Sequence, residues 1–231
     1  MRQVEDYSDE RNKNHCAHCG GPYETDDHVP SKVLLDEPYP ENLSISPSCQ
    51  RCNNELSKDE EYLACVLECV ICGSADPDKI QRPKIARRLE KSPKLAALIA
   101  KCCRTENGQM IWDFDMNRIM NVILKLARGH ASFELAEPRN MEPDSFLCKP
   151  LATLTAEEKL RFEDGPQIQF SACPEVGSRA MSRILVQGTD VYDEGFLVVQ
   201  EGRYRFRAMQ ENGVTIQMIL REYLACEVVW S

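Results

Sequence analysis

The sequence has no long hydrophobic run and no excess of basic residues, and both absences narrow what the protein can be. No stretch approaches the ~18 consecutive apolar residues of a transmembrane helix. The polar start, MRQVEDYSDERNKN, lacks the apolar core of a signal peptide. We therefore expect a cytoplasmic protein that has no membrane partner. The formal net charge of −9 argues mildly against a protein that coats nucleic acid.

Aromatic residues are also few, at 7%, whereas cysteine is abundant, with 12 residues in a chain of 231. In a reducing compartment, many cysteines indicate metal binding or burial, not disulfides. The segment from 15 to 56 has too little apolar content to form a core without a staple. Two pairs with the spacing CxxC flank it, and we expect them to bind one structural zinc ion through four thiolates: Cys16, Cys19, Cys49 and Cys52.

The residues between and directly after these pairs could carry chemistry. Asp27 and Asn53 offer a carboxylate and an amide oxygen, which are ligands that a hard divalent ion such as Mg²⁺ prefers. His28 could take a proton from a water molecule that attacks phosphorus, because its ordinary pKa lies near neutrality. Asn42 has both a donor and an acceptor and could hold the orientation of His28.

Two of these assignments have neighbours that compete for the same role. Asp26 could replace Asp27 as the ligand if the strand is offset by one residue, and Asn54 competes in the same way with Asn53. His15 and His18 flank the first cysteine of the zinc set, and either could replace a cysteine as a ligand. The four-cysteine set is complete without them.

The combined pattern CxxC…DH…N…CxxCN resembles the HNH endonucleases, also called the ββα-metal or His-Me finger group, in their zinc-stapled form. The resemblance covers about residues 16 to 58. It implies that His28 is the general base, that Asp27 and Asn53 bind the catalytic Mg²⁺ or Mn²⁺, and that Asn42 supports His28. It also implies a β-hairpin followed by a helix, with His28 ending the first strand.

The resemblance implies an enzyme, a metal-dependent endonuclease that hydrolyses phosphodiester bonds of DNA, with RNA as the alternative substrate. Such nucleases are common in phage defence, restriction and mobile elements, so a homodimer or partner proteins of a defence system are further expectations. The alternative, from another class, is a non-catalytic zinc module in a protein that binds nucleic acid or another partner. Such a module has no need for the four polar residues between and after the cysteine pairs.

The rest of the chain predicts an α+β fold with three parts: a zinc-bound ββα-metal (HNH) nuclease module over 1–64, a helical region with a basic patch over 65–145, and an antiparallel β-rich C-terminal domain over 146–231. Helices are expected from Lys58 to Cys72 after a Ser57–Glu60 capping box and before Gly73, from Ser92 to Cys103, and from Asp113 or Asp115 to a stop at Gly129. A second capping box at Thr155–Glu158 predicts a short helix. After Pro166, strands are expected at QIQF, RILVQ, FLVVQ, RYRFRA, VTIQMIL and CEVVW.

Further cysteines and basic residues have simpler interpretations beside functional ones. Cys65, Cys69 and Cys72 share a helix face with apolar residues, so we expect them in a core and not in a second metal site. The segment from 79 to 104 has nine Lys/Arg and one acid, which indicates either a solvated face or a surface that binds phosphate. Three arginines lie on one face of an expected strand and could follow a nucleic-acid backbone or meet acids of a partner: Arg203, Arg205 and Arg207.

Overall fold

The computed structural model describes residues 4–7, 13–107, 109–163, 177–188, 192–210 and 213–231. It has an α+β fold, as the sequence predicts. The chain divides into two compact units, one formed by residues 1–54 and 123–231 and the other by residues 55–122. The three-part division expected from the sequence stays a prediction. Among the described residues, no helix combines the length and the apolar character needed to cross a membrane.

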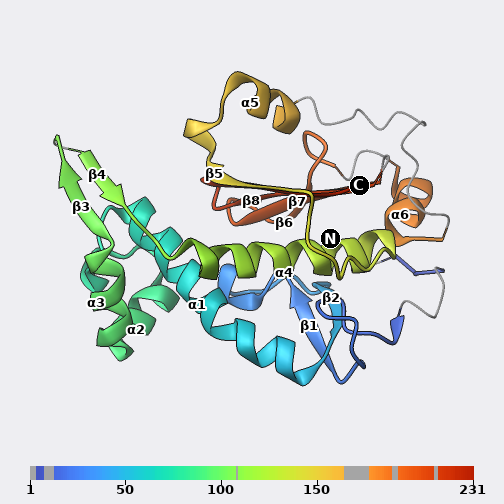
Figure 1. Cartoon of the computed structure of the whole chain (residues 1–231), viewed down its shortest axis with the longest axis horizontal. Coiled ribbons are helices and arrows are strands. Elements are labelled where there is room, and N and C mark those ends of the chain that lie inside the picture. Colours follow the sequence, from blue (N-terminus) through green and yellow to red (C-terminus); the bar gives the residue numbers. More distant parts are fainter. Residues whose placement is uncertain (1–3, 8–12, 108, 164–176, 189–191, 211–212) are drawn as a thin grey trace. The chain divides into compact units, whose positions relative to one another are not determined.

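The first unit begins with a β-hairpin that leads directly into a helix (Figure 1). Strands β1 (Thr25–Val29) and β2 (Ser44–Ser48) are antiparallel, and the loop between them contains the short 3-10 helix η2 (Lys32–Leu34). Helix α1 (Gln50–Cys72) follows after one residue. Side chains alternate between a buried and a more exposed face along both strands, as expected for a hairpin that packs on one side only.

Helix α1 begins eight residues earlier than the sequence predicts, at Gln50 and not at Lys58. The Ser57–Glu60 capping pattern therefore lies inside the helix and does not begin it. The predicted end is confirmed: Gly73 has a φ of 63°, and its N–H donates to the carbonyl of Val70. The N–H of Ser74 donates to the carbonyl of Cys69, which completes a Schellman motif.

The second unit holds the C-terminal part of α1, the 3-10 helix η3 (Pro77–Lys79), helices α2 (Pro83–Lys91) and α3 (Pro93–Lys101), strands β3 (Cys103–Glu106) and β4 (Gln109–Trp112), and the start of α4 (Met116–Leu135). Proline at the first position of α3 confirms the predicted Ser92-Pro93 start, although the helix ends at Lys101. The β3–β4 hairpin was not expected. Cys65 and Cys69 are fully buried, which confirms their predicted place in a core.

Helix α4 passes through Gly129, where the sequence predicts a stop, and continues to Leu135. Packing explains this glycine: a Cβ atom at position 129 would lie 2.5 Å from Cγ2 of Val29 on β1. The glycine therefore lets the helix approach the hairpin closely, and it does not end the helix. The next turn of α4 contacts the large sheet, because Nε2 of His130 lies 2.8 Å from the hydroxyl of Tyr204 on β7.

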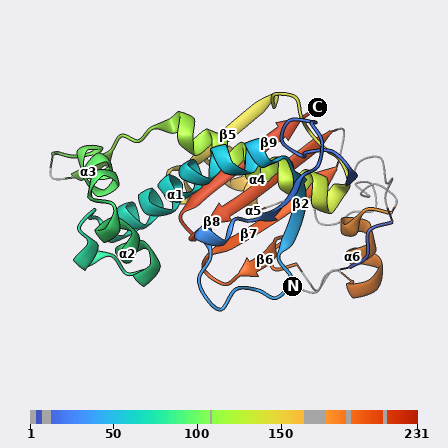
Figure 2. The same cartoon turned by 90° about the horizontal axis from the view of Figure 1, so that it is seen from below.

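The C-terminal part of the first unit is a five-stranded antiparallel sheet with the strand order β5-β9-β8-β7-β6 (Figure 2). Its strands are β5 (Ser145–Pro150), β6 (Leu197–Gln200), β7 (Tyr204–Gln210), β8 (Val214–Leu220) and β9 (Leu224–Trp230). Four of them confirm predicted apolar runs, whereas β5 was not expected. Helix α5 (Ala156–Glu163) follows the 3-10 helix η4 (Leu151–Thr153), and Phe162 of α5 belongs to a core cluster with Phe196, Ile219 and Ala225.

The sequence prediction was right for the start of α5 and wrong for the run RILVQ. Thr155 and Glu158 form the predicted capping box, in which the Thr155 N–H donates to Glu158 Oε2 at 2.8 Å and the Glu158 N–H donates to Thr155 Oγ1 at 3.2 Å. The run RILVQ is helical and forms the end of α6 (Arg179–Gln187), which Ser178 caps through the N–H of Met181. The run QIQF lies outside the described residues.

Candidate metal centre and the adjacent histidine site

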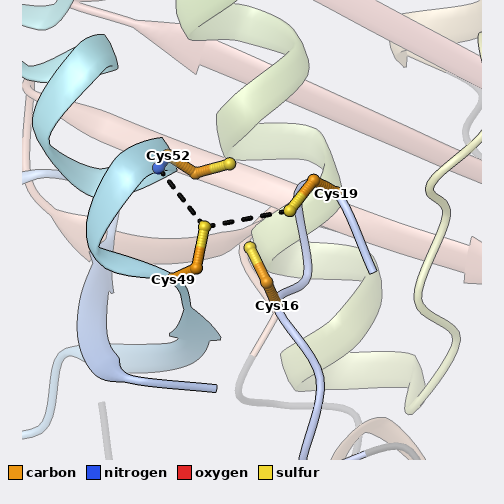
Figure 3. Close-up of side chains that lie close together, drawn as sticks. All are labelled: Cys16, Cys19, Cys49 and Cys52. Atoms are coloured by element: carbon orange, nitrogen blue, oxygen red, sulfur yellow. Dashed lines mark hydrogen bonds between the residues drawn. The ribbon is translucent and has the colours of Figure 1, made fainter. Parts of the chain in front are cut away.

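Four cysteine thiols converge at the N-terminal end of α1, and their sulfur atoms point toward one another (Figure 3). The sulfur atoms all lie within 4.8 Å of one another, and those of Cys19 and Cys49 are 3.8 Å apart. A zinc ion with tetrahedral Zn–S bonds of about 2.3 Å would place its ligands roughly 3.8 Å apart. The predicted set of Cys16, Cys19, Cys49 and Cys52 could therefore hold a zinc ion.

The cluster joins three parts of the first unit. Cys16 and Cys19 come from the loop before β1, Cys49 directly follows β2 and precedes α1, and Cys52 lies in the first turn of α1. The N–H of Ala17 donates to the carbonyl of Pro47 on β2 at 2.8 Å, which attaches the loop to the hairpin. A bound metal ion would thus fix the loop, the hairpin and the helix to one another.

The thiols differ in how readily they ionise. Burial raises the pKa of Cys16, but hydrogen bonds from the backbone N–H groups of Cys49, His18 and Cys19 outweigh this effect and lower the pKa to about 6. Burial and the neighbouring thiols raise the pKa of Cys52 well above its ordinary value. Metal binding would convert all four groups to thiolates, because the thiolate is the form that binds zinc.

The two histidines beside the first cysteines do not belong to this cluster of metal-binding side chains in the described part of the chain. His15 is exposed. His18 is buried, and its ring nitrogen Nε2 lies 3.0 Å from Oδ2 of Asp27. The alternative in which a histidine replaces a cysteine as a zinc ligand is therefore not supported.

Asp27 lies on the buried face of β1, where it is an ion-pair partner. Its Oδ2 atom lies 3.0 Å from Nζ of Lys125 on α4, in addition to its contact with His18. The side chains of Asp27 and Lys125 are 6% and 2% exposed. Burial pushes the pKa of Asp27 upward, but the His18 hydrogen bond and the Lys125 charge outweigh burial and hold this pKa below its ordinary value.

His28 lies on the opposite face of β1, where it is partly exposed. Burial lowers its pKa, the charge of Lys32 adds to this effect, and the charges of Asp27 and Asp26 oppose it, so the net shift is downward. The ring is therefore neutral at neutral pH and can accept a proton. This is the protonation state that a general base requires.

The two predicted amide residues lie in different kinds of structure, one in a loop and the other in a helix. Asn42 is exposed in the loop just before β2. Asn53 lies in the first turn of α1, and its Nδ2 atom donates to the backbone carbonyl of Asp26 at 3.4 Å. The helix therefore brings the Asn53 amide to β1, next to the strand residue that precedes the Asp27–His28 pair.

A cavity of about 280 Å³ opens beside the exposed face of the hairpin. Asp26, Ile45 and Pro47 line it from the hairpin, and Phe133 and Arg179 line it from the end of α4 and the start of α6. Arg179 lies over the Phe133 ring, and its Nη1 atom is 3.1 Å from Oδ2 of Asp6. This cavity is not predictable from the sequence, because its lining comes from segments that are far apart in the chain, from Asp6 to Arg179.

The three arginines in and directly before β7 have partners within the chain. Arg203 lies 2.6 Å from a carboxylate oxygen of Asp36, and Arg205 donates to both carboxylate oxygens of Glu222 at 3.0 and 2.9 Å. Arg207 is buried, and burial lowers its pKa to about 10. The face that could follow a nucleic-acid backbone instead meets acids and backbone carbonyls of its own chain.

Comparison with known proteins adds no relative: no family model, no curated protein and no solved structure matches this chain significantly.

Proposed function

We propose that the protein is a zinc-stapled endonuclease of the HNH type, with His28 as the general base. The observation that carries this proposal is the placement of His28: a neutral imidazole lies on the open face of β1, in a hairpin that leads into a helix. The four-cysteine cluster joins that hairpin to that helix. The order of strand, strand and helix is the order that the resemblance to the HNH family implies.

His28 would activate the attacking water in phosphodiester hydrolysis. The water oxygen forms a bond to phosphorus while His28 takes one of the water protons, and the bond from phosphorus to the leaving sugar oxygen breaks. The leaving oxygen takes a proton from solvent. Asn42 in the neighbouring loop would orient His28.

The resemblance assigns the divalent ion, Mg²⁺ or Mn²⁺, to Asp27 and Asn53. In HNH enzymes such an ion stabilises negative charge on the phosphate. In this structure the Asp27 carboxylate is already neutralised by the ammonium group of Lys125. That donor pair does not fit a divalent ion.

DNA is the proposed substrate, and RNA is the alternative. The basic segment in the second unit supports a nucleic-acid substrate, because several of its cationic side chains are exposed: Lys79, Arg87, Lys91, Lys94 and Lys101. Such groups bind phosphates and do not read sequence. A role in phage defence, restriction or a mobile element, with a homodimer or defence proteins as partners, follows from the resemblance alone.

A plasmid-nicking assay tests this proposal. We expect the zinc-loaded protein to nick supercoiled DNA in Mn²⁺ or Mg²⁺, and His28→Ala to lose about 10²- to 10⁴-fold in rate while its thermal unfolding is unchanged. Added imidazole should restore part of the lost rate. Glu157→Gln, an exposed change in α5, serves as a control that is purified in the same way and keeps full activity.

Two outcomes contradict the proposal. Equal rates for wild type and His28→Ala would remove the general-base assignment. If neither protein cleaves any DNA or RNA substrate although zinc is bound, the alternative is favoured, in which the cysteines hold a non-catalytic zinc module that binds nucleic acid or a protein partner.

A further inference from the structure

The register of the first hairpin separates Asp27 from His28. Asp26 pairs with Pro47, Asp27 with Ser46 and His28 with Ile45. Because neighbouring side chains in a strand point to opposite faces, Asp26 and His28 share one face and Asp27 lies on the other. The burial pattern agrees: Asp27 is buried, whereas Asp26 is exposed and His28 is partly exposed.

On the buried face, the Asp27 carboxylate is already paired with the Lys125 ammonium group. The contacts from Lys125 and His18 both reach Oδ2 of Asp27 at 3.0 Å, and the three side chains are at most 6% exposed. A divalent cation bound to Asp27 would lie within a few ångströms of the Lys125 ammonium in a poorly solvated site, where repulsion between like charges is strong. Asp27 therefore has the surroundings of a structural ion pair and lacks those of an open ligand.

Asp26 is more accessible to a cation than Asp27 is. Its carboxylate is exposed, and Oδ1 accepts a hydrogen bond from the uncharged hydroxyl of Tyr23 at 2.9 Å, so its negative charge is not cancelled by that partner. The Asn53 amide reaches the backbone of the same residue. The Asp26 carboxylate and the His28 imidazole thus share one face of β1, and the Asn53 amide reaches the same strand at the carbonyl of Asp26.

We propose that Asp27 is an internal strut that ties β1 to α4 and to the first cysteine pair, and that Asp26 supplies the carboxylate for a divalent ion beside Asn53 and His28. The assignment of Asp26 rests on the proposed nuclease function. The strut role of Asp27 rests on the contacts with Lys125 and His18 alone.

The two roles are separated by measuring stability and Mn²⁺ binding on the zinc-loaded full chain. We expect Asp27→Asn to lower the melting temperature by roughly 6 °C or more, since it leaves the Lys125 charge buried without its carboxylate. The double variant Asp27→Asn with Lys125→Met should recover most of this loss. Titration with MnCl₂ should show that every Asp27 variant that folds binds Mn²⁺ with an affinity within about twofold of wild type. The double variant gives the clearest test, because its stability should be closest to that of wild type.

Asp26→Asn should behave in the opposite way, with an unchanged melting temperature and Mn²⁺ affinity at least about tenfold weaker. The inference is overturned if Asp27→Asn, or the double variant, loses Mn²⁺ binding while Asp26→Asn keeps it, or if wild type binds no Mn²⁺ up to millimolar concentration. The structural role of Asp27 would be overturned if the loss of stability in the double variant equalled the sum of the losses from Asp27→Asn and Lys125→Met. Nicking by wild type and by His28→Ala is scored separately, so this inference can fail while the nuclease proposal stands.

Discussion

His130 is a completely buried histidine whose ring is held between α4 and the C-terminal sheet. Its ring centroid lies 3.7 Å from that of Phe206, and its Nε2 atom lies 2.8 Å from the Tyr204 hydroxyl. Burial lowers the pKa of His130 to about 3. The folded protein therefore carries this ring in its neutral form throughout the range in which an ordinary histidine becomes charged.

This burial predicts a loss of stability in mild acid. Below an unfolded-state pKa of about 6.5, the unfolded chain takes up a proton that the folded protein does not bind until about pH 3, so the free energy of unfolding falls as pH falls through this window. Between pH 6 and pH 5, urea unfolding should show a drop about 1 kcal/mol larger for wild type than for His130→Gln. Parallel curves for the two proteins would show that the ring is protonated in the folded state.

For individual residues, the sequence was sufficient to predict which side chains form the candidate site. It was not sufficient to predict the side chains with which they pair. The sequence names Asp27, which directly precedes His28, and keeps Asp26 as its competitor, because an offset of the strand by one residue would move the ligand role to Asp26. What distinguishes them is Lys125, which is almost a hundred positions further along the chain. The one available signal was a lysine within an otherwise apolar helix face, in the run VILKLA, where a buried charge requires a partner.

At the scale of elements, Gly129 predicts an unusual response to alanine. In an ordinary helix interior, Gly→Ala stabilises by up to about 1 kcal/mol. Here the new Cβ would lie 2.5 Å from Cγ2 of Val29, so we expect Gly129→Ala to destabilise the protein by about 1–2 kcal/mol in chemical unfolding. In a Val29→Ala background the same substitution should be neutral or stabilising. Stabilisation of the otherwise wild-type protein would contradict the packing argument.

The same local pattern can begin a helix or lie inside one, and this limited the prediction of elements. Thr155–Glu158 caps α5, whereas Ser57–Glu60 lies in the third turn of a helix that had already begun at Gln50. The difference comes from the second cysteine pair. Cys49 directly precedes α1 and Cys52 lies in its first turn, so the helix begins at this pair. In the same way, the run RILVQ is apolar enough for a strand or a helix, and the Ser178 cap before it decides for the helix.

At the scale of the whole molecule, the charge distribution limits where a nucleic acid can bind. Arg203, Arg205 and Arg207 have partners within their own chain, so they are poor candidates for phosphate contacts. The exposed cations of α2 and α3 remain candidates, since they lie on one short segment of the second unit. Counting charges in the sequence identified both basic regions equally well. Only the structure shows which of these side chains are paired within the chain and which are exposed.

The first hairpin and the start of α1 depend on the four cysteines acting as one metal centre, because the segment from 15 to 56 has little apolar content with which to fold. Cys148 and Cys226 offer a matched control, since their sulfur atoms lie 3.6 Å apart in the C-terminal sheet and outside the cluster. Zinc content of the purified protein, measured by elemental analysis, tests the centre most directly. We predict one zinc ion per chain in wild type and in Cys148→Ser. In Cys49→Ser we predict that the zinc ion is lost and that the hairpin no longer folds. Wild-type protein that folds fully without any bound metal would contradict the account.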